Sequence, residues 1–390
     1  MIHRIRIQNF KSLRDVTVEL SPVTVFIGKS GTGKTNFVSA IRFLRDYLIQ
    51  GGVPPYANQQ NWRCATNPKG PPEFSVEFTI SGMNTPFHYT LRLSSERDYL
   101  LLEELSCETE TGQKIIFSQA KPRPPSSSPL QVSPSVIWQV PPSLISPPEP
   151  GALALGRLPG LEEAVLAYTA LTAGIGVYNF PYDVLRKSET VSSNFGLADK
   201  GENYLQVLRQ LLTDLQDIET PKAMVATLQC LNPTIATIQP NSIQQPQRVI
   251  VGHRLGEKIL PLDLDQESDG FRRFFAHLLA LYQKPSKQTL VFEEPENGIY
   301  PAALKLLGGE FKAAPDAGRG QVLLTTHSPM LLDEFSDEQI RVVELVDLET
   351  RIGPLAQDQR EALREQLLHP GELFTVETPR MAAGEVETAG

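Results

Sequence analysis

The sequence lacks the features that mark membrane, secreted and disulfide-stabilised proteins. It has no run of 18 or more apolar residues, and its most apolar long stretch, residues 151–180, is interrupted by charged side chains, so no membrane span is expected. The N-terminal residues alternate charged and apolar side chains without a signal-peptide core. The three cysteines form no Cys-x-x-Cys pair, which argues against a disulfide framework or a zinc site. These absences predict a cytoplasmic protein.

A general excess of positive charge is also missing. The formal net charge of the 390 residues is −9, which argues against a protein that coats nucleic acid by bulk charge. The charge is uneven, however, because residues 1–50 hold eight Lys or Arg against three acidic residues. A local basic face could contact the phosphate backbone of DNA. Equally, these cations could serve a bound nucleotide and solubility, and both interpretations remain open.

Residues 28–35 carry the strongest positive signal in the chain. They read Gly-Lys-Ser-Gly-Thr-Gly-Lys-Thr, a complete G-x-x-x-x-G-K-[ST] phosphate-binding loop between an apolar strand pattern and a helical pattern. We expect Lys34 to reach the β- and γ-phosphates of ATP and the Thr35 hydroxyl to ligate Mg²⁺. The candidate nucleotide-binding residues here are Gly28, Ser30, Gly31, Gly33, Lys34, Thr35 and Asn36.

A second apolar strand pattern, residues 289–296, ends in acidic side chains. A P-loop ATPase needs a carboxylate at such a strand end to hold the Mg²⁺ shell. Glu293 occupies that place, and Glu294 is the natural general base for the attacking water. A core strand that enters an acidic turn is the structural alternative.

Two further sites have weaker signals. His327 follows the short apolar strand pattern that starts at Gln321, where its imidazole could sense the γ-phosphate, although a lone His at a strand end is usually structural. Ser268, Asp269 and Gly270 precede a strongly helical run. A Ser followed by Gly at a helix start can bind an anion, or it can be only an N-cap.

The pattern of the chain divides it into five parts. Residues 121–150 contain ten prolines and seven serines, which excludes continuous helix or strand ladders there. The predicted parts are an N-terminal half of an ATPase head (1–120), a Pro/Ser-rich loop (121–150), an inserted helical lobe (151–245), a C-terminal half of the head (246–347) and a C-terminal extension with a tail (348–390).

Taken in chain order, these motifs resemble the ABC-type ATPases of the SMC/RecF/OLD group, and most of all the stand-alone bacterial AAA-like ATPases. The opening Ile7–Leu13 and the segments Leu197–Asn203 and Glu296–Pro301 are also typical of that group. The resemblance implies an α/β fold: an ABC-type P-loop head with a mixed central sheet, N-terminal antiparallel strands and an inserted helical lobe. It also assigns Ser268 and Gly270 to a signature motif that caps ATP bound to a second subunit.

The resemblance therefore implies a head-to-head homodimer or higher oligomer with two composite sites. This chain departs from the group's pattern at Glu293, Ser30 and Glu267, where Asp, Asn and Leu are usual. Gln59 and Gln60 are candidates for the lid-loop glutamine. The helices of residues 158–230 are too short for a coiled-coil arm, and the 63 residues after His327 are too few for a Toprim nuclease. We expect any DNA cleavage to belong to a separate nuclease or other effector.

Three hypotheses for the function follow. The first is an ATP-hydrolysing switch that dimerises on ATP and acts on DNA or in anti-phage defence. The second is a scaffold that binds ATP and assembles an effector complex with little or no hydrolysis. The third, a P-loop kinase, is disfavoured by the Glu293–Glu294 pair, since kinases position an acceptor instead of water. A preference for GTP is disfavoured because the sequence has no Asn-Lys-x-Asp motif.

Overall fold

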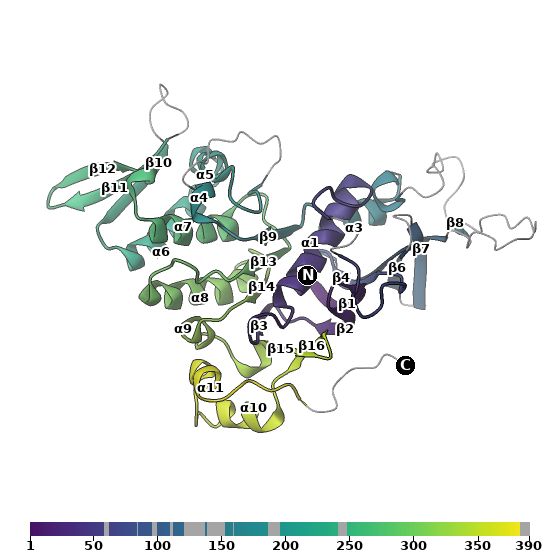
Figure 1. The fold of residues 1–390 in the computed structure, drawn as a ribbon. Coiled ribbons are helices and arrows are strands. Elements are labelled where there is room, and N and C mark those ends of the chain that lie inside the picture. The colour runs from purple at the N-terminus through teal and green to yellow at the C-terminus, as the bar shows by residue number, and fades with distance from the viewer. Residues whose placement is uncertain are drawn as a thin grey trace, which may run out of the picture.

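A computed structural model describes residues 1–57, 62–83, 85–95, 100–109, 112–120, 137–138, 153–158, 160–185, 196–240 and 248–382. Their strands form three sheets of seven, six and three strands (Figure 1). The candidates Gln59 and Gln60, and residues 121–150 apart from Ile137–Trp138, lie outside the described residues. The mixed α/β architecture with N-terminal antiparallel strands confirms the predicted fold class.

The N-terminal sheet is antiparallel throughout and has the strand order β2-β1-β4-β5-β6-β7-β8. Its buried residues alternate with more exposed ones along β4 and β5, as expected for strands with one face on a core. The strands are β1 (Ile2–Phe10), β2 (Leu13–Glu19), β4 (Glu73–Thr79), β5 (Pro86–Leu93), β6 (Leu100–Thr109), β7 (Gly112–Ala120) and β8 (Ile137–Trp138).

The six-stranded sheet positions the site. Its order is β16-β15-β3-β14-β13-β9, with every neighbouring pair parallel except β15 and β16. The carboxyl ends of β3, β13 and β14 therefore meet at one edge of the sheet, where α/β proteins place their ligands. The strands are β3 (Val23–Ile27), β9 (Ile175–Tyr178), β13 (Thr289–Glu293), β14 (Gln321–Thr325), β15 (Ile340–Val346) and β16 (Glu349–Pro354).

Helices cover both faces of this sheet. On one face, Phe26 shares a hydrophobic cluster with α1 (Lys34–Gln50), α3 (Glu162–Leu171) and the N-terminal sheet. On the other face, Val25 and Ile27 share a second cluster with α7 (Asp269–Tyr282) and α8 (Pro301–Asp316). Because successive strand side chains point to opposite faces, β3 contributes to both cores. Figure 1 shows α1 between the two large sheets and α7 beside α8.

The third sheet extends from the α7 side of the molecule (Figure 1). It is antiparallel, with the order β10-β11-β12, and packs with α5 and α6. Its elements and their neighbours are α4 (Tyr182–Leu185), α5 (Tyr204–Thr213), α6 (Glu219–Leu231), β10 (Ile235–Pro240), β11 (Val249–Leu255) and β12 (Lys258–Asp263).

The structure divides the middle of the chain differently from the predicted lobe of residues 151–245. β9, inside that range, is a strand of the six-stranded sheet beside β13, and the range is thus not wholly helical. The predicted boundary at 245 falls between β10 and β11, which pair with each other. Both differences arise from pairing between strands distant in the sequence, which local periodicity does not reveal.

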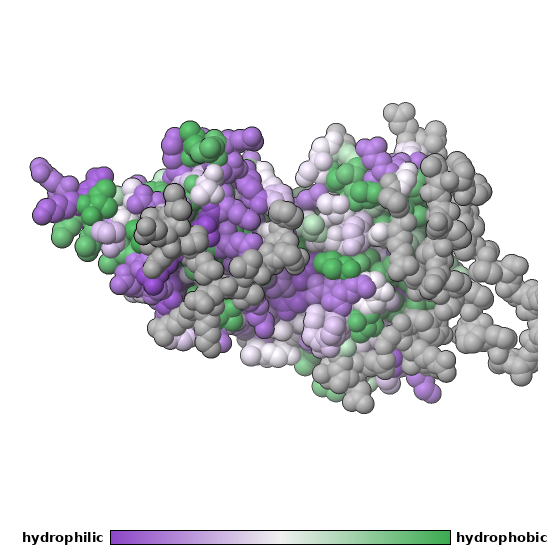
Figure 2. All heavy atoms as spheres, turned by 90° about the horizontal axis from the view of Figure 1, so that it is seen from above, coloured by the Kyte–Doolittle hydropathy of each residue, from purple (hydrophilic) through white to green (hydrophobic). Residues whose placement is uncertain are grey.

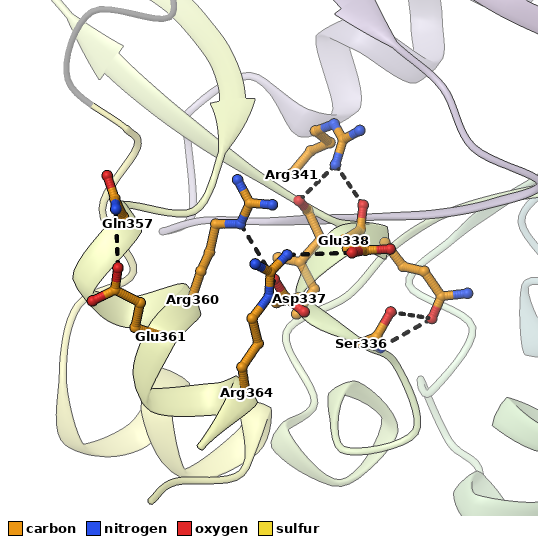
Figure 3. Close-up of polar contacts among 10 residues, drawn as sticks. Ser336, Asp337, Glu338, Arg341, Gln357, Arg360, Glu361 and Arg364 are labelled. Atoms are coloured by element: carbon orange, nitrogen blue, oxygen red, sulfur yellow. Dashed lines mark hydrogen bonds and ion pairs between the residues drawn. The ribbon is translucent and has the colours of Figure 1, made fainter. Parts of the chain in front are cut away.

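The described part of the C-terminal extension, residues 348–382, adds a strand to the six-stranded sheet. β16 pairs with β15, and it is followed by α10 (Gln357–Arg364) and α11 (Pro370–Val376). Arg360 and Arg364 of α10 converge on Asp337, with Nε–Oδ2 distances of 3.2 and 3.0 Å (Figure 3). Asp337 lies in the short 3₁₀ helix η4 (Asp337–Gln339), which immediately precedes β15. This ion cluster fastens α10 to the end of the sheet opposite the P-loop.

No helix within the described ranges is both long and apolar enough to cross a membrane. On the face seen in Figure 2, apolar groups form small patches separated by hydrophilic residues.

Candidate nucleotide-binding site

The P-loop connects β3 to α1, as its sequence predicts. At the start of α1, Gly33 has a φ of +107°, a value that side chains with a Cβ rarely adopt. A Cβ at this position would lie 2.0 Å from Thr350 Oγ1. Gly33 is therefore required both by the backbone conformation and by the close approach of β16.

Lys34 is buried, and its ammonium group is held inside the loop. Nζ donates to the carbonyl oxygens of Gly28 and Lys29 at 2.8 and 2.9 Å. Burial lowers the pKa of Lys34, and the carboxylates of Glu294 and Glu296 oppose that shift. The P-loop cation thus faces the two acidic residues that follow β13.

A hydroxyl network, which sequence reasoning missed, supports the loop from behind. Thr350 Oγ1 donates to the Thr32 carbonyl at 2.9 Å and lies 2.6 Å from Ser12 Oγ. The predicted nucleotide-binding residue Asn36 donates from Nδ2 to Ser12 Oγ at 2.7 Å. Its amide therefore points into this network. The predicted residues Ser30 and Gly31 lie on the exposed part of the loop.

Glu293 ends β13 on the edge to which the P-loop belongs. Its carboxylate makes one long contact, 3.5 Å from Asn179 Nδ2. Burial, and then the neighbouring Arg42, lower the pKa of Lys11, and the Glu293 carboxylate opposes them. Lys11 is thus a cation near Glu293. The sequence motifs did not predict a role for Lys11.

The predicted Mg²⁺ ligands fit that ion. The Thr35 side chain is exposed at the start of α1, and Glu293 is half-buried with its carboxylate weakly engaged. Both offer oxygen, the ligand atom that Mg²⁺ prefers. In P-loop ATPases the remaining ligands are phosphate oxygens and water. Within the described ranges, no group of three or more His, Cys, Asp or Glu side chains could hold a metal by itself.

Glu294 has a strained backbone and an oriented carboxylate. Its φ is +46°, in the left-handed region that a non-glycine residue rarely adopts. The N–H of Glu294 donates to the Thr325 carbonyl at 3.1 Å, which fixes it against β14. Asn297 Nδ2 donates to Oε2 at 2.9 Å, and His327 Nε2 lies 3.7 Å from Oε1. Backbone strain of this kind is concentrated at functional sites.

His327 follows β14 and faces Glu294. Its backbone N–H donates to Glu296 Oε1 at 2.7 Å, and Phe374 of α11 lies edge-on to its ring at 6.5 Å between centroids. Burial, and then Lys34, lower the pKa of His327, against the opposing effect of Glu294 and Glu296. The imidazole is therefore neutral at pH 7 and carries one N–H donor. No sequence pattern indicates a role for Phe374.

The structure brings together Lys34, Glu294, Glu296 and His327, but it does not add the predicted signature residues. Ser268 is the N-cap of α7, with Oγ accepting from the Phe271 N–H at 3.2 Å, and Asp269 forms an ion pair with Arg272. Within the described part of the chain, no hydrogen bond joins residues 268–270 to the P-loop. Within a single copy of the chain, Ser268 therefore acts as the N-cap of α7.

The segment Leu197–Asn203, which is typical of the group that the sequence resembles, connects α1 to the end of α7 behind the site. Asp199 accepts a bidentate ion pair from Arg45 of α1, at 2.8 and 2.7 Å, while the Leu197 N–H donates to Gln283 beside α7 at 2.9 Å. Burial alone would lower the pKa of Arg45. The neighbouring carboxylates of Asp199 and Asp46 outweigh this effect and raise the pKa. The segment ties the P-loop helix to the helix that Ser268 starts.

The fold is that of an SMC head. A head bound to the C-winged helix domain of ScpA superposes with a TM-score of 0.56 at 11% identity, covering 92% of this chain and 99% of that structure. A head with an extended coiled coil, bound to the C-terminal domain of ScpA derived from Pyrococcus furiosus, gives 0.50 at 13% identity, covering 94% and 99%. These matches show that the chain has the fold of an SMC head.

The family is shown by a match over most of the chain. Residues 23–333 match the family described as "AAA domain, putative AbiEii toxin, Type IV TA system", and the chain belongs to that family. A curated relative, the OLD nuclease of Thermus scotoductus (strain ATCC 700910 / SA-01), is 20% identical over 360 residues. The alignment covers 88% of this chain and 62% of that nuclease, so the chain spans less than two thirds of its length. The predicted resemblance is confirmed.

Proposed function

We propose that the protein hydrolyses ATP as an ABC-type ATPase whose heads dimerise on ATP. The observation that carries the proposal is the setting of Glu294. Its carboxylate is bracketed by Asn297 and His327, and it acts electrostatically on the P-loop Lys34. A carboxylate next to the γ-phosphate position is what a general base for water attack requires.

Each residue has a separate task in this proposal. Lys34 leaves its two loop carbonyls to bind the β- and γ-phosphates, and Glu294 accepts a proton from the attacking water. Neutral His327 donates its N–H to the γ-phosphate. Thr35 and Glu293 would hold Mg²⁺, which neutralises developing charge on the phosphates when bound.

A second copy of the chain supplies Ser268 in this proposal. The support is the open N-terminus of α7, whose Ser268 and Gly270 make no hydrogen bond with the P-loop among the described residues, together with the SMC-like head. The backbone N–H groups at a helix N-terminus favour an anion such as the γ-phosphate. Two such sites would form in a head-to-head dimer.

The setting we propose is a DNA transaction or anti-phage defence in the cytoplasm, with a nuclease or other effector on a separate protein. The support is the nuclease relative and the toxin named in the family description. A scaffold that uses ATP binding alone would share every contact described above, and the experiment below therefore measures turnover and assembly together.

The test is Glu294→Gln in the full chain, measured by phosphate release and by light scattering with MgATP. We expect turnover to fall at least 100-fold, as for loss of a general base, while ATP affinity stays within about threefold and the ATP-bound dimer accumulates. Adding Ser268→Arg should abolish that dimer. Glu361→Gln, on the exposed face of α10, is the matched control and should behave as wild type. Undiminished turnover in Glu294→Gln would remove the proposed mechanism, and a wild type that dimerises without turnover would favour the scaffold.

A further inference from the structure

The turn after Glu294 links the proposed general base to the helix that Ser268 starts. Asn297 is the central residue of this link. Its side-chain Nδ2 donates to Glu294 Oε2 at 2.9 Å, and its backbone N–H donates to the Glu294 carbonyl at 3.1 Å. Its own carbonyl accepts a hydrogen bond from Arg273 Nη1 of α7. One residue thus contacts both the Glu294 carboxylate and the α7 helix.

The packing between α7 and this turn is tight. Gly298 has a φ of +71°, and a Cβ there would lie 2.6 Å from Arg273 Nη1. On the same side of α7, a Cβ on Gly270 would lie 3.0 Å from the Gly298 carbonyl oxygen. A contact this close transmits a shift of the helix directly, because there is no space in which the turn could stay behind.

The Arg273 side chain is specialised for this contact. Its Nε is buried and has no hydrogen-bond partner within the described ranges, so the bond to the Asn297 carbonyl is the main polar anchor of the guanidinium. Among the described residues, no carboxylate forms an ion pair with Arg273. A buried guanidinium nitrogen that lacks a hydrogen bond is costly for stability, and such a cost is often retained where a residue has a functional role.

We propose that Arg273 and Asn297 are positioning residues that report the state of the signature helix to Glu294. The inference rests on the proposed function, because the second copy's nucleotide is what would move the α7 N-terminus at Ser268. A shift of α7 moves Arg273, Arg273 moves the Asn297 carbonyl, and the Asn297 amide then turns the Glu294 carboxylate. The strained φ of Glu294 is a backbone feature of the kind that is concentrated at switch regions.

The geometry favours Asn297 over His327 as the group that orients Glu294. The amide contact is 2.9 Å, within hydrogen-bond range, whereas the imidazole contact is 3.7 Å. With Oε2 held by Asn297, Oε1 is left to receive the proton of a water on the His327 side. Losing the amide frees the carboxylate rotamer and leaves the P-loop contacts of Lys34 untouched.

The experiment uses full-length Asn297→Ala, Arg273→Met, Arg273→Lys and the double variant Arg273→Met/Asn297→Ala. We expect kcat to fall about 10- to 100-fold in Asn297→Ala, with KM, ATP affinity and dimerisation within about threefold, as for a misoriented general base. Arg273→Met should lower kcat about tenfold, and Arg273→Lys should restore most of it. Because the two residues act in series, the double variant should equal Asn297→Ala. Arg319→Met, which removes an arginine that follows α8 and pairs with Glu310 away from the Glu294 turn, is the matched control and should keep the wild-type kcat.

The outcomes separate this inference from the proposed function. Wild-type kcat in Asn297→Ala, or additive losses in the double variant, would overturn the link while the proposed ATPase stands. If kcat and thermal stability fall together in Arg273→Met and Arg273→Lys restores neither, the contact is merely structural, and the proposed link is also overturned. Absence of turnover or of ATP-dependent dimers in the wild type would instead overturn the proposed function and, with it, the basis of this inference.

Discussion

The two ends of the six-stranded sheet use similar charged side chains in opposite ways. At the end away from the P-loop, Asp337 accepts from two arginines of α10, and both contacts are ion pairs within hydrogen-bond distance. At the P-loop end, Lys34 bonds to backbone carbonyls and to neither nearby carboxylate. There the buried Glu296 Oε2 has no hydrogen-bond partner within the described ranges.

This contrast separates stability from function along a single sheet. Charges that are paired within the chain contribute to folding and leave little for a ligand. Charges left incompletely paired, next to a strained backbone, lower the stability of the chain alone and are satisfied when a ligand binds. β16 joins the two ends, because Thr350 supports the P-loop while Gly353 and Pro354 line the pocket beside Asp337.

The largest effect that the comparison predicts is at Lys34. In Lys34→Ala the loop loses its phosphate-binding cation, and we expect MgATP affinity to fall at least 100-fold, roughly 3 kcal/mol. Titration calorimetry or a fluorescent ATP analogue measures the loss directly. Folding should change little, because the Nζ bonds only link the loop to itself.

Lys29→Ala is the matched control, since Lys29 lies in the same loop but its side chain is exposed. It should retain affinity within about threefold, as expected for an exposed cation. Wild-type affinity in Lys34→Ala would contradict the nucleotide site itself and leave the two ends of the sheet without a functional difference.

The sequence predicted this end of the sheet well because its signals are local. The P-loop is a contiguous motif, and residues such as Glu293 and His327 directly follow short apolar strands. Parallel strands bring such residues to one edge without any further information. The order of the motifs was then enough to group Lys34, Glu294 and His327, and in the structure His327 Nε2 lies 3.7 Å from Glu294 Oε1.

What the sequence could not provide depends on contacts between distant segments. Thr350 lies 318 residues from its P-loop partner Thr32, and no periodicity marks it. Asn297 belonged to a typical segment, but its contact with Arg273 requires the packing of α7 against the turn. β9 reads as part of a helical region because its four residues are too few to show a strand pattern.

The second prediction tests the paired end. Asp337→Asn keeps the shape of the side chain but removes the charge that Arg360 and Arg364 share, and Asp337 is only 9% exposed. We expect a loss of about 2 kcal/mol in the free energy of unfolding, because a nearly buried carboxylate with two partners is replaced by an amide. Urea denaturation followed by circular dichroism measures the loss.

Asp358→Asn is its control, because the ion pair between Asp358 and Arg380 is exposed on both sides. It should leave the urea denaturation midpoint at the wild-type value, as expected for a fully exposed ion pair. MgATP affinity should be unaltered in both variants. A loss of affinity in Asp337→Asn comparable to that in Lys34→Ala would show that the far end also serves the nucleotide, and the proposed division would be wrong.

The smallest predicted effect is at Thr350, where β16 connects the two ends. Thr350→Val preserves the volume of the side chain but removes the hydroxyl that donates to the Thr32 carbonyl and contacts Ser12. Because this contact is buried, its loss should cost about 1 kcal/mol in stability. It should also weaken MgATP binding two- to fivefold, since the P-loop loses its support from behind. Thr350→Ser keeps the hydroxyl and should restore both properties. If the Val variant loses stability but keeps wild-type affinity, the network belongs with the paired charges of the far end, and the boundary between stability and function lies closer to the nucleotide than we propose.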